Sequence, residues 1–97
     1  MVFDLRWTEE AEADRADIYE YIGESDPGAA LRMDRRFELA ANRLTLSPML
    51  GRDGVVAGTR EFIPHPNYRL VYEIAGDEIW ILALIHVARQ WPPVEPD

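Results

Sequence analysis

Two side chains in the C-terminal third of the sequence are suited to chemistry, an arginine and a histidine. Arg69 interrupts "NYRLVYEI", residues 67–74, a run otherwise typical of a β-strand. Its guanidinium either pairs with a carboxylate, such as Glu61 or Glu73, or faces an anion at the floor of a site. His86 is a candidate general acid or base, because an imidazole can take up and release a proton in the physiological pH range. Alternatively, it is a strand-end histidine that is hydrogen-bonded to the backbone.

A β-hairpin would bring the arginine and the histidine together. "AGDE" between two apolar runs predicts a tight turn centred on Gly76-Asp77. The resulting register pairs Ile74 with Ile79, Val71 with Leu82, Arg69 with Leu84, and Asn67 with His86. Arg69 and His86 are then diagonal neighbours on one face, roughly 7–8 Å apart at the backbone. The sequence therefore predicts a site at which both side chains reach one ligand.

The same register assigns the hairpin's side chains to two faces. The face expected to carry the helices is almost wholly apolar and holds Tyr68, Leu70, Tyr72, Ile74, Ile79, Ile81, Ala83 and Ile85. The opposite face holds Arg69, Val71, Glu73, Trp80, Leu82, Leu84 and His86. Large apolar side chains on an uncovered face are typical of a docking surface. The alternative is that the C-terminal tail or a second copy of the chain covers this face.

Two helices are expected to precede the hairpin. Residues 2–7 alternate as a short strand with one buried face, and Thr8 then offers a helix N-cap. This first helix should end near residue 22, with an inward stripe of Ala11, Ile18, Tyr21 and Ile22. Asp26 and Pro27 start a second helix that runs to about residue 46. Its inward residues are Ala30, Met33, Phe37, Ala40 or Ala41, and Leu44.

The remaining chain is expected to form sheet. A glycine-spaced loop at 49–58 leads into strands at 59–63, 68–74 and 79–86, and "PHP" at 64–66 turns the chain. The order β-α-α-β-β-β predicts an α+β fold, in which an N-terminal helical hairpin packs on one face of an antiparallel sheet. We expect one domain, residues 1–97, with residues 88–97 as a C-terminal tail.

Charge is unevenly distributed along the chain. The net charge is −8, which disfavours a general nucleic-acid binder. Residues 8–26 hold eight acidic residues against Arg15, a net of −7, whereas residues 27–52 hold five arginines against two acidic residues, a net of +3. All ten basic residues are arginine. The antiparallel helices can place Arg32, Arg35, Arg36 and Arg43 toward the acidic first helix, although most of these charges are expected to form solvated ion pairs.

Composition excludes several kinds of site. The chain has no cysteine and two histidines, His65 and His86, so neither a disulfide framework nor a zinc site is expected. No cofactor is expected. The longest apolar run, residues 79–85, is too short to span a membrane, and the N-terminus lacks signal-peptide features. We expect a cytoplasmic protein.

The ordered set of segments resembles the RelE/ParE superfamily, the toxins of bacterial type II toxin–antitoxin modules. The resemblance extends over "LRWTEEAEADRADIYEYI", "SPMLGR", "YRLVYEI" and "LALIHVARQW", nearly the whole chain. It implies the fold predicted above and a cognate antitoxin partner, whose extended C-terminal segment covers the working surface of the toxin in a hetero-oligomer. Helix-in-groove and strand-addition contacts suit such a partner.

The superfamily divides by mechanism. RelE-like members cleave mRNA on the ribosome with basic and acid–base residues, and a nuclease of this type would use Arg60, Arg69 and His86. ParE-like members lack such residues and poison DNA gyrase. This chain has no lysine, is acidic overall, and has Trp91 where a proton donor would be needed. We therefore favour the ParE-like branch. The alternatives are the nuclease branch and a non-toxic relative that acts only as the antitoxin-bound partner in repression.

Candidate contacts to the target or the antitoxin are mostly basic or aromatic residues of the sheet and tail. They are Arg52, Arg60, Arg69, Trp80, Leu82, Leu84, His86, Arg89 and Trp91. For Arg89 and Trp91 the alternative role is packing of the tail.

Overall fold

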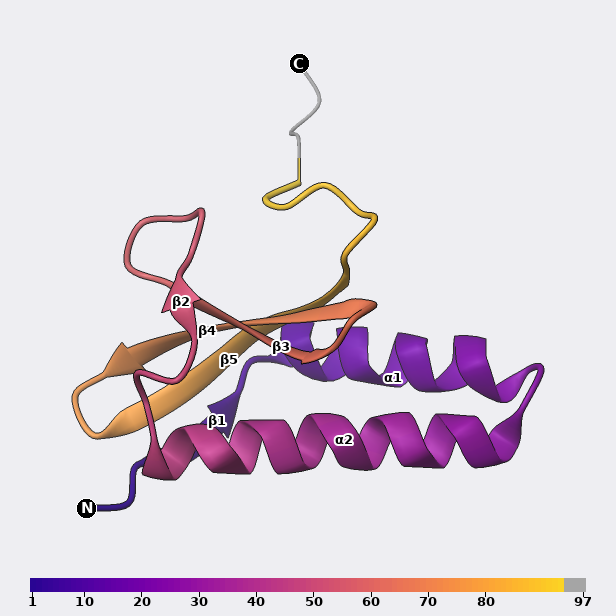
Figure 1. Cartoon of the computed structure of the whole chain (residues 1–97), viewed down its shortest axis with the longest axis horizontal. Coiled ribbons are helices and arrows are strands. Elements are labelled where there is room, and N and C mark those ends of the chain that lie inside the picture. Colours follow the sequence, from indigo (N-terminus) through magenta and orange to yellow (C-terminus); the bar gives the residue numbers. More distant parts are fainter. Residues whose placement is uncertain (94–97) are drawn as a thin grey trace.

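The computed structural model of the chain describes residues 1–93. In chain order the elements are β1 (Asp4–Trp7), α1 (Glu9–Gly23), α2 (Pro27–Leu46), β2 (Arg52–Asp53), β3 (Arg60–His65), β4 (Tyr68–Ala75) and β5 (Glu78–His86). The predicted α+β architecture is confirmed. Both helices lie on one face of a five-stranded sheet (Figure 1). Neither helix has an apolar stretch of the length needed to cross a membrane.

Both helices begin at the predicted caps. The Thr8 hydroxyl accepts a hydrogen bond from the N–H of Ala11 at 3.1 Å, and the Asp26 carboxylate accepts one from Ala29, also at 3.1 Å. These bonds satisfy amide donors that have no partner within the helix. Pro27 occupies the first turn of α2, where its missing N–H has no cost. The two helices therefore start where the sequence specifies and run side by side (Figure 1).

The sheet has the strand order β1-β5-β4-β3-β2. All neighbouring pairs are antiparallel except β1 and β5, which run parallel. The predicted wholly antiparallel arrangement is thus wrong for β1. The reason is topological, because the chain leaves β1 into the helical hairpin and passes through three further strands before β5 aligns beside it.

The core lies between the sheet and the helical hairpin. Its buried members come from both layers: Ala11, Phe37, Ala41, Leu44, Tyr68, Leu70, Tyr72, Ile79, Ile81 and Leu84. The stripe predicted for α2 is confirmed. In α1, Ala11 and Ile18 face the core as predicted, but Tyr21 is 72% exposed, so its inward assignment is wrong. Tyr21 stands near the end of α1, where its ring borders a surface pocket instead.

The segment between α2 and β4 also differs from prediction. The loop expected at residues 49–58 contains the short strand β2, which pairs with Glu61 and Arg60. Strand β3 continues through Pro64 to His65, so "PHP" does not end it. A register irregularity between Phe62 and His65 accommodates the proline, which cannot donate to the ladder.

Candidate functional site

A β-bulge in β5 determines where the predicted site residues point. Near the turn, the pairs Ile74–Ile79, Glu73–Trp80 and Tyr72–Ile81 follow the predicted register. Leu82 then has no partner in β4, and the next pairs are Val71–Ala83, Leu70–Leu84, Arg69–Ile85 and Tyr68–His86. Because one inserted residue reverses which face each later side chain occupies, every β5 side chain beyond Leu82 lies on the opposite face from that predicted.

The bulge separates Arg69 from His86. His86 lies opposite Tyr68, whose ring packs in the core on the helix side of the sheet. Arg69 alternates with Tyr68 and Leu70 and therefore points to the other face. The predicted shared site of these two residues is wrong. Leu84 is also misplaced in the prediction, since it is 3% exposed and belongs to the core.

Side chains of the N-terminal segment satisfy the backbone at the bulge. Beyond Ile81, β5 has no β1 residue beside it. The N–H of Leu84 donates to Asp14 Oδ2 in α1 at 3.0 Å, and the Thr8 hydroxyl donates to the Leu82 carbonyl at 3.4 Å. These contacts provide partners for backbone groups that the ladder leaves unpaired. Helix α1 and its N-cap residue Thr8 thus hold the bulge in place.

Arg69 is engaged by a buried carboxylate. Its Nε lies 3.3 Å from Glu61 Oε1, although its N–H is not directed at that oxygen. Glu61 is 2% exposed, and its other oxygen accepts a hydrogen bond from the N–H of Val55 at 2.9 Å. Of the two alternatives considered for Arg69, the ion pair with Glu61 is confirmed. The guanidinium therefore has a counter-charge within the fold.

The chain itself partly covers the face that carries Arg69. Val71 is 0% and Ala83 5% exposed, although both point away from the helices. The loop between β2 and β3 and the segment after β5 both rise on this side of the sheet (Figure 1). Trp91 in that segment is half-buried, and its Nε1 is fully buried. This face is therefore less open than predicted. The side chains that remain accessible on it are half-buried, and they include Trp80.

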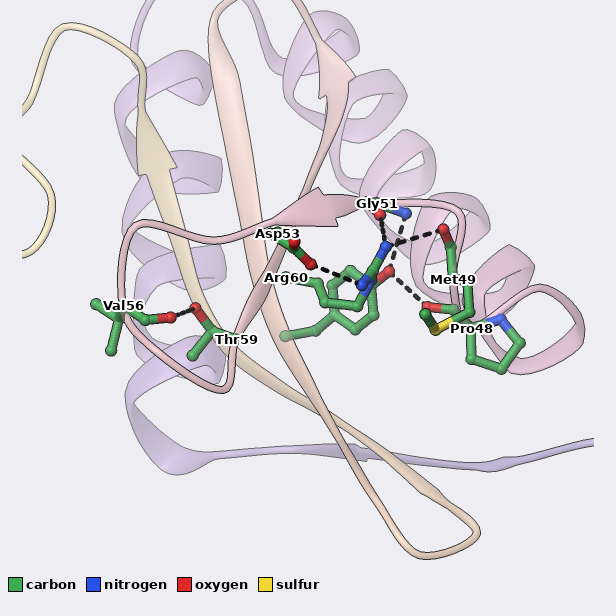
Figure 2. A network of polar contacts seen from close by, with 8 residues as sticks. Pro48, Met49, Gly51, Asp53, Val56, Thr59 and Arg60 are labelled. Carbon is green, nitrogen blue, oxygen red and sulfur yellow. Dashed lines mark hydrogen bonds and ion pairs between the residues drawn. The ribbon is translucent and has the colours of Figure 1, made fainter.

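Arg60 anchors the loop that follows α2. Its guanidinium donates to the carbonyl of Met49 at 3.2 Å and to the carbonyl of Gly51, and it pairs with the Asp53 carboxylate at 3.1 Å (Figure 2). The neighbouring candidate Arg52 is exposed on β2. These contacts give Arg60 a structural role that is sufficient to explain an arginine at this position of β3. Arg52, in contrast, is exposed and can contact a partner.

His86 borders a pocket between α1 and the ends of β4 and β5. The pocket has a volume of about 550 Å³, and its lining includes Asp14, Asp17, Tyr21, Tyr68 and Arg89. The His86 Nδ1 accepts a hydrogen bond from the N–H of Ala88 at 3.1 Å, as expected for a strand-end histidine. Burial raises the pKa of Asp14 above its ordinary value of 3.8, and the bond from Leu84 opposes that shift. Burial likewise raises the pKa of the Tyr68 phenol.

The sequence contained a signal for this pocket. Asp14 lies three residues after Ala11 and four before Ile18, which places a carboxylate within the inward stripe of α1. A charged residue at such a position needs a specific partner, and here that partner is the bulged backbone of β5.

The Asp14→Asn variant should change how stability depends on pH. The folded protein holds the Asp14 proton more tightly than the unfolded chain does, because the pKa is raised on folding. This carboxylate therefore lowers stability as pH rises from about 4 through its folded pKa. Asparagine keeps an acceptor for Leu84 but does not titrate. In urea unfolding between pH 3.5 and 7, the free energy of the variant relative to wild type should increase with pH, and a constant or decreasing difference would contradict this prediction.

A second concave surface, the arginine groove, lies between α2 and β3. Its volume is about 830 Å³, and it is bordered by Arg32, Arg35, Arg36 and Arg43 over Met33, Leu39, Phe62 and Ile63. The Arg43 guanidinium sits 5.8 Å from the centre of the Phe62 ring. These arginines were expected to face α1, and that prediction is wrong. Within residues 1–93, the ion pair that joins the two helices is Arg15–Asp34, with a distance of 2.6 Å between Nε and Oδ1.

Residues 5–91 match the family described as ParE toxin of type II toxin–antitoxin system, parDE. The chain belongs to the ParE toxin family. It is 36% identical over 91 residues to the putative toxin Y4kP of Sinorhizobium fredii, a match that covers 93% of this chain and 94% of that protein. It is 39% identical over 83 residues to toxin RelE2 of Caulobacter vibrioides, covering 86% and 93% of the two chains.

A solved structure supports the same assignment to the ParE family. The chromosomal ParDE system of P. aeruginosa contains a chain that superposes with a TM-score of 0.80 at 26% identity, covering 89% of this chain and 97% of that one. The names of the relatives include both ParE and RelE. Family membership therefore identifies a toxin of a toxin–antitoxin system and leaves its target to be inferred from the site.

In this ParE-family chain, the predicted site residues do not form one cluster. Arg69 and Trp80 share one face of the sheet, His86 and Arg89 border the pocket beside α1, and Arg60 anchors a loop. Within residues 1–93, no three His, Cys, Asp or Glu side chains are grouped so that they could hold a metal ion.

Proposed function

We propose that this ParE-family toxin inhibits DNA gyrase by binding to it, without chemistry of its own, and that a cognate antitoxin neutralises it. The observation that carries the proposal is the separation of Arg69 and His86 on opposite faces of the sheet. Cleavage of RNA by acid–base catalysis needs both a proton-transfer group and a charge-stabilising group within reach of one phosphate. Arg69 and His86 cannot supply this pair from opposite faces. Arg89 borders the same pocket as His86, but the carboxylates of Asp14 and Asp17 also line that pocket and disfavour a phosphate there.

The electrostatics favour the same proposal. The guanidinium of Arg69 already faces the buried carboxylate of Glu61, which competes with any phosphate. A chain with a net charge of −8 is also repelled by ribosomal RNA over distances comparable to the Debye length. A protein target of mixed charge is the better match for such a surface.

The arginine groove is the surface best suited to the antitoxin. It combines an apolar floor with guanidinium groups from Arg32, Arg35, Arg36 and Arg43, and no acidic residue among residues 1–93 lines it. Arg35 and Arg36 are exposed and form no ion pair with another residue of the described chain. An amphipathic helix with carboxylates along its edges would bury its apolar stripe there and pair with the arginines. The antitoxin is therefore expected to present an acidic amphipathic segment.

Charge reversal at Arg36 tests whether the antitoxin binds in the arginine groove. The Arg36→Glu variant should bind the product of the adjacent antitoxin reading frame about tenfold more weakly at physiological salt, because it places a carboxylate opposite the antitoxin's own. Arg52→Glu is the matched control, since Arg52 is also exposed but does not line the groove. Surface plasmon resonance measures the affinity of each variant for the antitoxin. Equal affinities for Arg36→Glu and wild type, or a larger loss for Arg52→Glu, would place the antitoxin elsewhere.

The target is tested with purified, antitoxin-free protein. We expect inhibition of DNA supercoiling by gyrase, relief of that inhibition by the antitoxin, and intact message on ribosomes incubated with the same protein. Cleavage of ribosome-bound message that is lost in Arg69→Ala and His86→Ala would refute the proposal in favour of a nuclease. Absence of both activities would identify a non-toxic partner of the antitoxin.

A further inference from the structure

We propose that the outer edge of β1 pairs with β1 of a second copy of this chain, so that the two sheets join across a twofold axis at Leu5. Strand β1 is the terminal strand of the sheet and pairs with β5 on its inner side (Figure 1). An edge strand presents a row of unpaired N–H and C=O groups, which is a template for a further strand. The inference is independent of the proposed action on gyrase.

The hydrogen bonds to β5 identify which backbone groups of β1 are free. The N–H groups of Asp4 and Thr8 donate to carbonyls at the β5 side, at 2.9 and 3.0 Å. Because successive residues of a strand point their backbone groups to opposite edges, those of Leu5 and Trp7 face outward. Among residues 1–93, none forms a backbone hydrogen bond with these outward groups. Two amide donors and two carbonyl acceptors are therefore available to another strand.

The charges of β1 are self-complementary. Asp4 and Arg6 are exposed and lie on the sheet face opposite the helices, because Leu5 between them packs toward the core. In an antiparallel pair centred on Leu5, Asp4 of each copy lies directly opposite Arg6 of the other. Charged side chains at a sheet edge normally prevent pairing, but opposite charges in this register stabilise it instead. A pair centred on Asp4 or on Arg6 would place like charges opposite each other, so the charges select one register.

Both charged groups have the capacity to pair across the axis. The Arg6 Nε donates to Glu78 Oε2 at 3.0 Å, but the two terminal nitrogens of this guanidinium form no hydrogen bond with residues 1–93. Asp4 forms no ion pair in the same part of the chain. A guanidinium has five N–H donors and can hold two carboxylates at once. Arg6 can therefore keep its contact with Glu78 and also bind Asp4 of the second copy.

Apolar side chains occupy the other face of this edge. Phe3, Leu5 and Trp7 are half-buried against the core. In the proposed register Leu5 meets Leu5 of the second copy, and Phe3 meets Trp7, so pairing covers more of their surface. The Phe3 N–H already donates to the carbonyl of Thr45 at 2.9 Å, so the new ladder ends there. The interface is short, and the net charge of −8 on each copy opposes association, so we expect a weak, reversible dimer.

Sedimentation equilibrium of the antitoxin-free protein tests this proposal by a charge swap. We expect a dimer with a Kd of about 100 µM. Asp4→Arg places arginine opposite arginine, and Arg6→Asp places aspartate opposite aspartate, so each variant alone should dimerise about tenfold more weakly. An equimolar mixture of the two variants should recover the wild-type affinity, because one copy then carries arginine at both positions and the other carries aspartate at both.

A matched control and a second measurement complete the test. Glu24→Arg makes the same change in net charge at an exposed residue after α1, away from β1, and should dimerise no more weakly than wild type. The amide hydrogens of Leu5 and Trp7 should exchange more slowly as the protein concentration rises. A protein that stays monomeric, or a mixture that fails to recover the dimer, would overturn the proposal. Protection of the Leu5 amide by the antitoxin alone would assign this edge to an antitoxin strand instead.

Discussion

Replacing Glu61 by alanine is expected to lower the free energy of unfolding by about 3 kcal/mol. Glu61 is 2% exposed, pairs with Arg69 and accepts the N–H of Val55. Its removal leaves the Arg69 side chain, which is only 19% exposed, without its counter-charge, and it frees the loop between β2 and β3. Most of the expected loss is the cost of leaving an unpaired charge, rather than the net stabilisation from the pair.

Urea unfolding of four variants separates these effects. Glu73→Ala removes a neighbouring carboxylate that forms no ion pair in residues 1–93, so it should cost less than about 0.5 kcal/mol. The double variant Glu61→Met, Arg69→Met should be more stable than Glu61→Ala, because it buries no unpaired charge. The free energy of unfolding of Arg69→Met alone should lie between that of Glu61→Ala and that of the double variant. A loss below about 1 kcal/mol in Glu61→Ala would show that the pair is solvated and that Arg69 is free to meet another anion.

Gly51→Ala is expected to be similarly destabilising, by about 3 kcal/mol. A Cβ at this position would lie 2.7 Å from the carbonyl oxygen of Glu61 and 2.8 Å from both Cε1 and the hydroxyl of Tyr72. None of these atoms can move easily, because two belong to a fully buried ring and one to β3. The Tyr72 hydroxyl also accepts the N–H of Gly51 at 2.9 Å and donates to the carbonyl of Pro48 at 2.6 Å, so a shift would break both bonds.

Gly23→Ala is the matched control for this substitution. Gly23 ends α1 with an ordinary helical φ, and a Cβ there would meet only the Cβ of Ala30 at 3.7 Å. Alanine should therefore stabilise the protein by up to about 1 kcal/mol, as expected in a helix. Thermal and urea unfolding of the two variants should give changes of opposite sign. A Gly51→Ala variant as stable as wild type would mean that the loop after α2 is not packed against Tyr72.

The helices could be predicted from sequence because their signals are local. Thr8, Asp26 and Pro27 specify the helix starts through contacts with residues three positions away, and a proline at 48 ends α2. The turn at Gly76, whose φ is +62°, equally fixes the first pairs of the β4–β5 hairpin. Each of these features depends on neighbours in the chain.

The bulge could not be predicted in this way. Residues 81–85 are apolar on both faces of the strand. If these side chains exchange faces, one aliphatic side chain replaces another, so the hydrophobic pattern of the sequence is the same with or without the bulge. The register is decided by contacts distant in sequence, such as the bond from the N–H of Leu84 to Asp14, seventy residues away. The ion pair of Arg69 with Glu61 was one of two interpretations of the sequence, whereas the pocket around Tyr68 depended on the bulge and was missed.

The separation of Arg69 and His86 is tested most directly by nuclear Overhauser effects on isotope-labelled protein. We predict cross-peaks between the ring protons of His86 and Tyr68, whose centroids lie 5.4 Å apart, and between the side chains of Arg69 and Ile85. Cross-peaks between the Arg69 side chain and the His86 ring, with none from His86 to Tyr68, would contradict the bulged register. They would also restore the acid–base pair that a ribonuclease needs.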